Sequence, residues 1–83
     1  MDTLISVKKI LRDTLNIGAR ADRLTAESAL LGSLPEFDSM AVVNVVAALE
    51  GEFGISVNDD ELSADIFATV GSLTQFVSDK LAE

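Results

Sequence analysis

Three segments of this chain repeat their apolar residues at the spacing of an α-helix, and this pattern constrains the fold most. Residues 3–15, 39–53 and 70–81 place apolar side chains three and four positions apart. A fourth, shorter helix is predicted before the last segment, because Asn58 followed by Glu61 resembles a capping box. The sequence therefore predicts an all-α fold, a four-helix bundle with a long ordered first loop and a short third helix.

The ends of these helices carry recognisable start and stop residues. Asp2 or Thr3 can cap the first helix, and Gly18 marks its end. Gly54 suits the position just after the second helix, where a left-handed backbone is common. Thr69 precedes the last apolar repeat and is predicted to cap it.

The first connection, residues 16–38, is long for a compact domain and has no clean period. It nevertheless contains large apolar residues, among them Leu24, Leu30, Leu31, Leu34 and Phe37. We therefore expect it to pack onto the core as an ordered loop, with a helical turn near residues 26–30. Pro35 stiffens its approach to the second helix.

The composition bounds what such a domain can do. The 83 residues are 48% apolar, which is enough for one small core, and with no Trp or Tyr that core must be largely aliphatic. The absence of Cys and His removes the commonest nucleophile, general base and metal ligand. We therefore predict a single domain over residues 1–83 that is not an enzyme, with no catalytic residue and no metal site.

The charge is unevenly distributed along the chain. Residues 1–23 hold five bases and three acids, whereas residues 24–83 hold one base and eleven acids, which gives the net charge of −8. An acidic surface repels nucleic acid and anionic lipid and attracts basic patches on proteins. The chain has no stretch of membrane-spanning length, and its start is amphipathic rather than signal-like. We expect a cytoplasmic monomer whose partners are proteins.

The run Asp38-Ser39-Met40 stands where the second helix begins. A serine hydroxyl at a helix N-terminus is often an ordinary cap. It is also a favourable position for a phosphate ester, because the first-turn N–H groups and the positive end of the helix dipole attract an anion. The run by itself is compatible with both interpretations.

Five short runs spread over nearly the whole chain resemble the acyl carrier proteins, a family that binds phosphopantetheine. They are Leu31-Gly32, Phe37-Asp38-Ser39-Met40, Ala48-Leu49-Glu50, Glu52-Phe53-Gly54-Ile55 and Thr69-Val70. The spacing from the serine to the Leu-Glu and Glu-Phe pairs, and the short acidic third helix, are the specific parts of this resemblance.

The resemblance implies a carrier function. A phosphopantetheinyl transferase would attach 4′-phosphopantetheine from coenzyme A to Ser39, with Asp38 and Met40 framing recognition by the transferase. The thiol of the arm, which the chain itself lacks, would hold an acyl group as a thioester and deliver it to acyl-loading and acyl-transfer enzymes. The aliphatic core could open to shelter the acyl chain, as it does in the family.

The second helix is also where the resemblance places contacts with partner enzymes. The candidate partner-binding residues are Met40, Val43, Ala47, Glu50 and Glu52. Met40, Val43 and Ala47 share one broad apolar face with Val46, Leu49 and Phe53, so they are compatible with a core role as well.

The helix also departs from the pattern of fatty-acid-synthesis carriers, in which its exposed start is strongly acidic. Here the matching positions are Ala41 and Asn44, and Gly51 replaces a further acid. The resemblance therefore points to a specialised member that serves a dedicated lipid or polyketide-like pathway rather than general fatty acid biosynthesis.

Two other functions are compatible with the sequence. One is a small helical protein-interaction module without a prosthetic group, which would use the same apolar stripes and acidic surface. The other is an aminoacyl or peptidyl carrier, because Asp38 directly before Ser39 suits either kind of carrier. The strongly acidic chain favours the acyl type.

Overall fold

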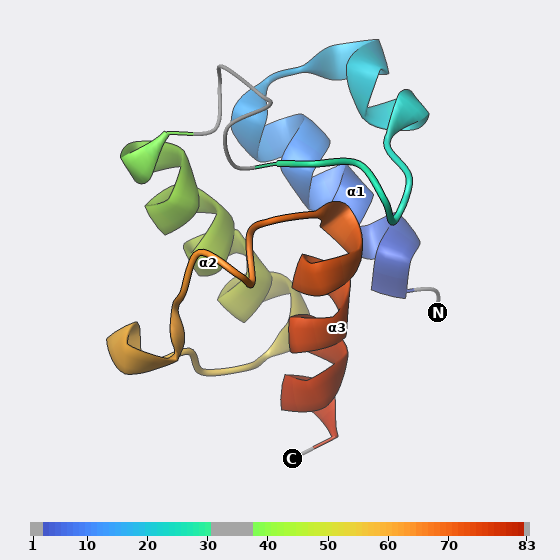
Figure 1. Cartoon of the computed structure of the whole chain (residues 1–83). Coiled ribbons are helices and arrows are strands. Elements are labelled where there is room, and N and C mark those ends of the chain that lie inside the picture. The colour runs from blue at the N-terminus through green and yellow to red at the C-terminus, as the bar shows by residue number, and fades with distance from the viewer. Residues whose placement is uncertain (1–2, 31–37, 83) are drawn as a thin grey trace.

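Helices account for most of the chain in the computed structural model, which describes residues 3–30 and 38–82. In chain order they are α1 (Thr3–Leu15), the 3₁₀ helix η1 (Gly18–Arg23), α2 (Ser39–Phe53), the 3₁₀ helix η2 (Asp59–Glu61) and α3 (Val70–Leu81). In Figure 1, α2 lies on the left of the bundle, and α1 and α3 lie to its right. The predicted all-α, four-helix architecture is confirmed, with η2 in the place of the short third helix.

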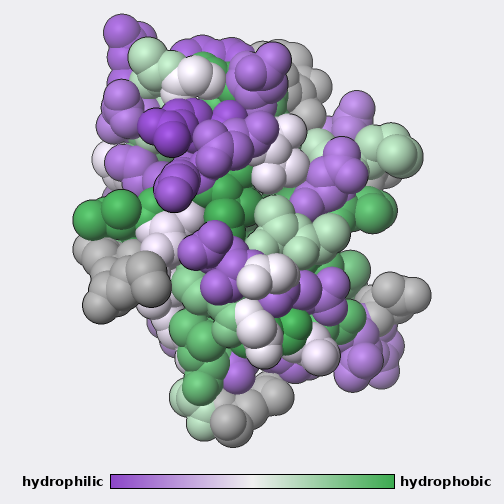
Figure 2. Space-filling model, turned by 180° about the vertical axis from the view of Figure 1, so that it is seen from behind, coloured by the Kyte–Doolittle hydropathy of each residue, from purple (hydrophilic) through white to green (hydrophobic). Residues whose placement is uncertain are grey.

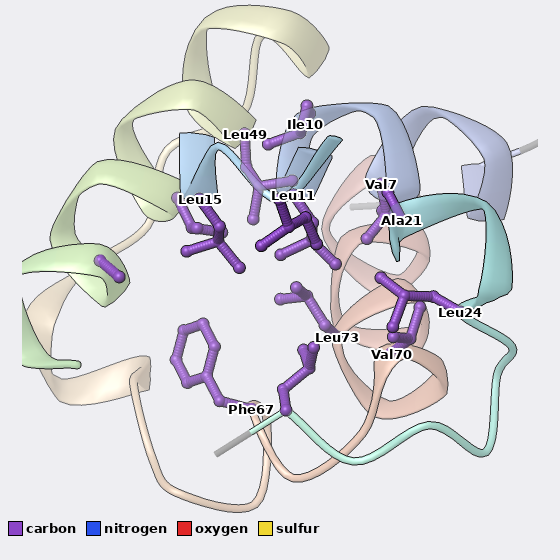
Figure 3. Close-up of a cluster of buried hydrophobic side chains, with 14 of the residues drawn as sticks. Val7, Ile10, Leu11, Leu15, Ala21, Leu24, Leu49, Phe67, Val70 and Leu73 are labelled. Atoms are coloured by element: carbon purple, nitrogen blue, oxygen red, sulfur yellow. The ribbon is translucent and has the colours of Figure 1, made fainter. Parts of the chain in front are cut away.

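Side chains from all three α-helices meet in one aliphatic core. Figure 3 shows labelled residues of α1, α2, α3 and the connections pointing toward one another. Burying each valine or leucine there contributes about 1.5–3 kcal/mol. The buried residues are Val7, Ile10, Leu11, Leu15, Ile17, Ala21, Leu24, Leu30, Ala41, Val45, Leu49, Phe67, Val70, Leu73 and Val77.

The first connection packs onto this core, as predicted for Leu24 and Leu30, but its local form differs from the prediction. α1 ends before Gly18, because Asn16 already has a left-handed backbone (φ 56°), and η1 follows. The predicted helical turn near residues 26–30 is a single turn, in which the Ser28 N–H donates to the Thr25 carbonyl at 3.0 Å. Leu31, Leu34, Pro35 and Phe37 lie outside the described residues.

The end of the first connection is tied to the start of α3. Ala29 and Thr69 form an isolated antiparallel bridge, in which the Leu30 N–H donates to the Ala68 carbonyl at 3.0 Å. On the other side of the bridge, the Val70 N–H donates to the Ser28 carbonyl at 2.9 Å. This tie explains why the loop is extended here: its backbone groups find partners across the chain instead of within a helix.

The predicted end of α2 and start of α3 are both confirmed. Gly54 adopts the left-handed conformation (φ 67°, ψ 30°), and its N–H donates to the Glu50 carbonyl at 2.9 Å. At the other helix, the Thr69 hydroxyl accepts from the Ser72 N–H at 3.0 Å, and the Ser72 hydroxyl accepts from the Thr69 N–H. This reciprocal capping box fixes where α3 begins.

The segment between α2 and α3 has a looser form than the α-helix that the Asn58–Glu61 pattern predicted. Only half of the capping box is present: a Glu61 carboxylate oxygen accepts from the Asn58 N–H at 2.8 Å, and a single 3₁₀ turn follows. Residues 63–68 then form successive turns. The Ser72 hydroxyl donates to the Ile66 carbonyl at 2.8 Å, so a contact with α3 replaces a helical hydrogen bond.

An ion pair fixes η2 to the C-terminal turn of α3. Lys80 Nζ lies 2.9 Å from Glu61 Oε1, with side chains that are 10% and 29% exposed. The hydrogen bond from the Asn58 N–H, and then the one from Lys80, hold the pKa of Glu61 below its ordinary value of 4.5. The Glu61 carboxyl group therefore binds a proton more readily in the unfolded chain than in the folded one. Its contribution to the free energy of unfolding is complete above the ordinary pKa and is lost as the pH falls through the folded-state pKa.

We expect the variant Glu61→Gln to be less stable than wild type near neutrality and to lose this disadvantage in acid. Thermal melts of both proteins between about pH 7 and about pH 3 measure the difference in Tm, which should narrow as the pH falls below the ordinary pKa of Glu61. A difference that stays constant over the whole range would show that the carboxylate charge does not stabilise this pair.

Candidate functional site

The start of α2 is organised by Asp38, which is the N-cap of the helix. Its backbone is extended (φ −103°, ψ −172°), and its Oδ1 accepts from the Ala41 N–H at 2.9 Å. The Asp38 carbonyl accepts the first helical hydrogen bond, from the Val42 N–H at 3.0 Å. Ser39 is therefore the first helical residue and not the cap, so the interpretation of Ser39 as an ordinary N-cap is wrong.

The electrostatics at this end of α2 favour an anion on the residue after the cap. Beyond the cap Asp38, whose carboxylate is engaged by the Ala41 N–H, the first turn of the helix contains no acidic residue. The N–H groups of a first turn point out of the helix end, and with the helix dipole they stabilise a nearby negative charge by about 0.3–1 kcal/mol. A phosphate ester on the first helical residue therefore fits this position.

Exposed apolar and neutral residues form one face of α2, which we call the α2 outer face. It consists of Met40, Val43, Asn44, Ala47 and Gly51, all exposed and spaced three or four positions apart. The opposite side of the helix supplies the buried residues Ala41, Val45 and Leu49. Met40 and Val43 are 68% and 61% exposed, so the core interpretation of these residues is wrong.

Ala41 does not lie where the comparison with fatty-acid-synthesis carriers placed it. Its side chain is 8% exposed and belongs to the core, so an acid at this position would be a buried carboxylate. Asn44 and Gly51 are exposed, as expected for positions that could carry a docking charge. The α2 outer face is therefore uncharged over its whole length.

The two candidate glutamates have different surroundings. Glu50 is half-buried, and its Oε2 accepts from the Val57 N–H at 2.9 Å, which holds the connection after α2 against the helix. Glu52 is exposed and lines a small cleft beside α1, together with Lys9 and Asp13. The structure thus brings Met40, Val43 and Ala47 together, whereas Glu52 lies on another side of α2.

An apolar hollow of about 230 Å³, largely open to solvent, lies between α2 and the turns that follow η2, and we call it the apolar cavity. Val42, one helical turn after Ser39, forms one wall, and Leu62, Ser63, Ala64 and Phe67 form the other. Sequence reasoning did not find this cavity. The spacing of Leu62, Ile66 and Phe67 fits the predicted short third helix, so the sequence carried no signal for a hollow here.

Metal sites and membrane-spanning helices are two other kinds of feature, and neither occurs in residues 3–30 and 38–82. No group of three or more Asp or Glu side chains in this part of the chain could hold a metal ion. No helix in the same residues is long and apolar enough to cross a membrane.

Comparisons with known proteins agree with this geometry. Residues 6–77 match the model of a family described as the phosphopantetheine attachment site. A holo acyl carrier protein from Nitrosomonas europaea, solved by NMR, is 57% identical over 100% of both chains, with a TM-score of 0.92. A holo acyl carrier protein from Geobacter metallireducens is 27% identical, over 99% of this chain and 88% of that one, with a TM-score of 0.78.

Proposed function

Because this chain belongs to the acyl carrier proteins, non-enzymatic carriers with a 4′-phosphopantetheine arm, we propose that Ser39 bears the arm within a single carrier domain, residues 1–83. The position of Ser39 as the first helical residue, directly after the cap Asp38, carries the proposal. Attachment there places the phosphodiester at the positive end of α2. The arm supplies the thiol that a chain without cysteine lacks.

The apolar cavity supports a second element of the function, shelter for the acyl chain. Val42 is one turn from the attachment residue, so the cavity opens close to the root of the arm. Its walls are Val42, Leu62, Ala64 and Phe67 with a single serine, and such a lining excludes water from an acyl chain. We propose that these residues hold the cargo between visits to partner enzymes.

The α2 outer face supports delivery to dedicated partners of a specialised lipid or polyketide-like pathway. Met40 and Val43 are large apolar side chains left in water beside the attachment residue, and apolar surface of this kind often marks a binding site. The same face offers no carboxylate to the basic patches that steer acidic carriers onto their enzymes. A partner that recognises this carrier must therefore rely on apolar contact.

We expect the holo protein to be a poor substrate for a malonyl transferase of general fatty-acid synthesis, and the variant Asn44→Glu/Gly51→Glu to be a better one. Both positions are exposed, and a Cβ added at Gly51 meets no atom within 4 Å. Each new ion pair contributes up to about 1 kcal/mol, so the gain in loading rate should be roughly fivefold to tenfold at low salt.

The matched control is Asn44→Gln/Gly51→Gln, which adds the same side-chain bulk without charge and should load like wild type. The gain of the glutamate variant should shrink at high ionic strength, because salt screens exposed charges. Wild-type loading equal to that of an ordinary fatty-acid carrier would refute the specialised function. An equal gain in loading rate for the glutamate and glutamine variants would show that the lack of charge on the α2 outer face does not cause the poor loading.

A further inference from the structure

Helix α1 carries a basic face on the side opposite the core. Ile5, Lys8, Lys9 and Arg12 follow one another three and four positions apart, whereas Val7 and Leu11 point inward. Together with Ala21 and Asp22 of η1, these four residues line a groove of about 270 Å³, which we call the α1 groove. Three of the six basic residues of an acidic chain therefore lie in one surface groove.

The positive charges of the α1 groove take little part in ion pairs within the described part of the chain. Within residues 3–30 and 38–82, neither Lys8 nor Lys9 forms an ion pair, although the chain has a net charge of −8. Arg12 Nε approaches Asp13 Oδ1 at 3.4 Å, with both side chains about half exposed, and such a surface pair contributes little. Lys80 differs, because it is closely paired with Glu61.

An exposed apolar residue accompanies these charges. Ile5 is 64% exposed at one end of the groove, one turn from Lys8 and Lys9. Figure 2, which shows the molecule from behind, has a dense group of hydrophilic residues beside separate apolar patches on this face. A surface that combines cations with an apolar residue at helical spacing complements an acidic amphipathic helix.

We infer that the α1 groove docks an acidic amphipathic helix of a partner protein. Carboxylates of that helix would meet Lys8, Lys9 and Arg12, and an apolar side chain would cover Ile5. A membrane or a nucleic acid is a poorer match, because the net charge of −8 repels an extended anionic surface, whereas a short acidic segment meets only the local positive charge.

This docking site is separate from the α2 outer face. No residue of α2 lines the α1 groove, so a helix seated in the groove does not need to cover Met40 and Val43. The carrier could then be held by one protein through α1 while it presents its arm to an enzyme through α2. The inference does not depend on which pathway the carrier serves.

The test is a titration of the isotope-labelled holo protein with a synthetic helical peptide that presents leucine and glutamate on one face, followed by NMR. We expect chemical-shift changes centred on residues 5–12 and on Ala21 and Asp22, and weaker binding as salt is added. Lys9→Glu should weaken binding about tenfold, because it replaces an attraction by a repulsion. Ile5→Ser should weaken it about threefold.

The matched control is Arg23→Glu, which changes the net charge equally at an exposed position of η1 that does not line the groove. It should weaken binding less than twofold. Four results would each overturn the inference: equal losses for Lys9→Glu and Arg23→Glu, equal binding of a peptide with glutamine for glutamate, shift changes centred on α2, or no binding at millimolar peptide. Stronger shifts at the same residues with phosphatidylserine vesicles would assign the groove to a membrane surface instead.

Discussion

Replacing Ser39 by alanine is expected to abolish attachment of the phosphopantetheine arm. The phosphate ester needs the serine hydroxyl, and alanine offers no atom to bond. Wild type and Ser39→Ala are each incubated with coenzyme A, magnesium and a transferase of broad specificity, and their intact masses are measured. Wild type should gain one phosphopantetheine unit and the variant none. The variant should fold normally, because Asp38 and not Ser39 caps the helix and alanine is a good helix former.

Two control variants sharpen this result. Ser56→Ala removes an exposed serine from the connection after α2, and this variant should load like wild type. Asp38→Asn keeps a good capping residue but removes the carboxylate, so slower loading at an unchanged Tm would assign Asp38 a role in transferase recognition. A mass gain in Ser39→Ala would place the arm on another residue and refute the proposed attachment site.

The three α-helices could be predicted closely because their signals are local. In α3 the apolar period agrees with the capping residue, because Thr69 caps the helix as predicted. In α1 the apolar period gave the bounds, although Asn16 and not the predicted Gly18 ends the helix. The bounds of α2 follow from the Asp38-Ser39 run at one end and Gly54 at the other. Where periodicity and capping residues agree, the local sequence is sufficient to predict where a helix begins and ends.

The orientation of α2 could not be predicted, because small and apolar residues occur on every side of it. The sequence placed Met40, Val43 and Ala47 on the same face as Leu49, whereas the structure buries Ala41, Val45 and Leu49 and exposes the other three. Which side faces inward is decided by packing against α1 and α3, and a nearly uniform apolar pattern carries little information about it.

The segment between α2 and α3 depends on contacts that are distant in the sequence. Glu61 pairs with Lys80, and the Ile66 carbonyl accepts a hydrogen bond from the Ser72 hydroxyl, so these polar groups have partners without an α-helix. The apolar cavity follows from this arrangement, because Leu62 and Phe67 face Val42 across it. The motif therefore makes Ser39 the candidate attachment residue, but only the folded chain reveals the cavity beside α2.

Gly71→Ala is expected to destabilise the domain strongly for the addition of a single methyl group. The Gly71 N–H donates to the Ala26 carbonyl at 2.7 Å, and a Cβ at Gly71 would lie 2.7 Å from that same oxygen. The backbone at Ala26 would have to move, and the neighbouring bridge between Ala29 and Thr69 would be disturbed with it. We expect a loss of about 2–3 kcal/mol, as for other overpacked sites. In a domain of this size, that lowers Tm by roughly 10–20 °C.

Gly51→Ala adds the same methyl group where it meets no atom within 4 Å, at an exposed position in the last turn of α2. Because alanine is the better helix former, this variant should be more stable than wild type by about 0.5–1 kcal/mol. The two variants differ only in the space around the new Cβ, so opposite shifts of Tm in thermal melts would isolate the close contact at Ala26 as the cause. A rise in Tm for both would mean that the first connection yields easily at Ala26, and that its tie to α3 contributes little to the stability of the fold.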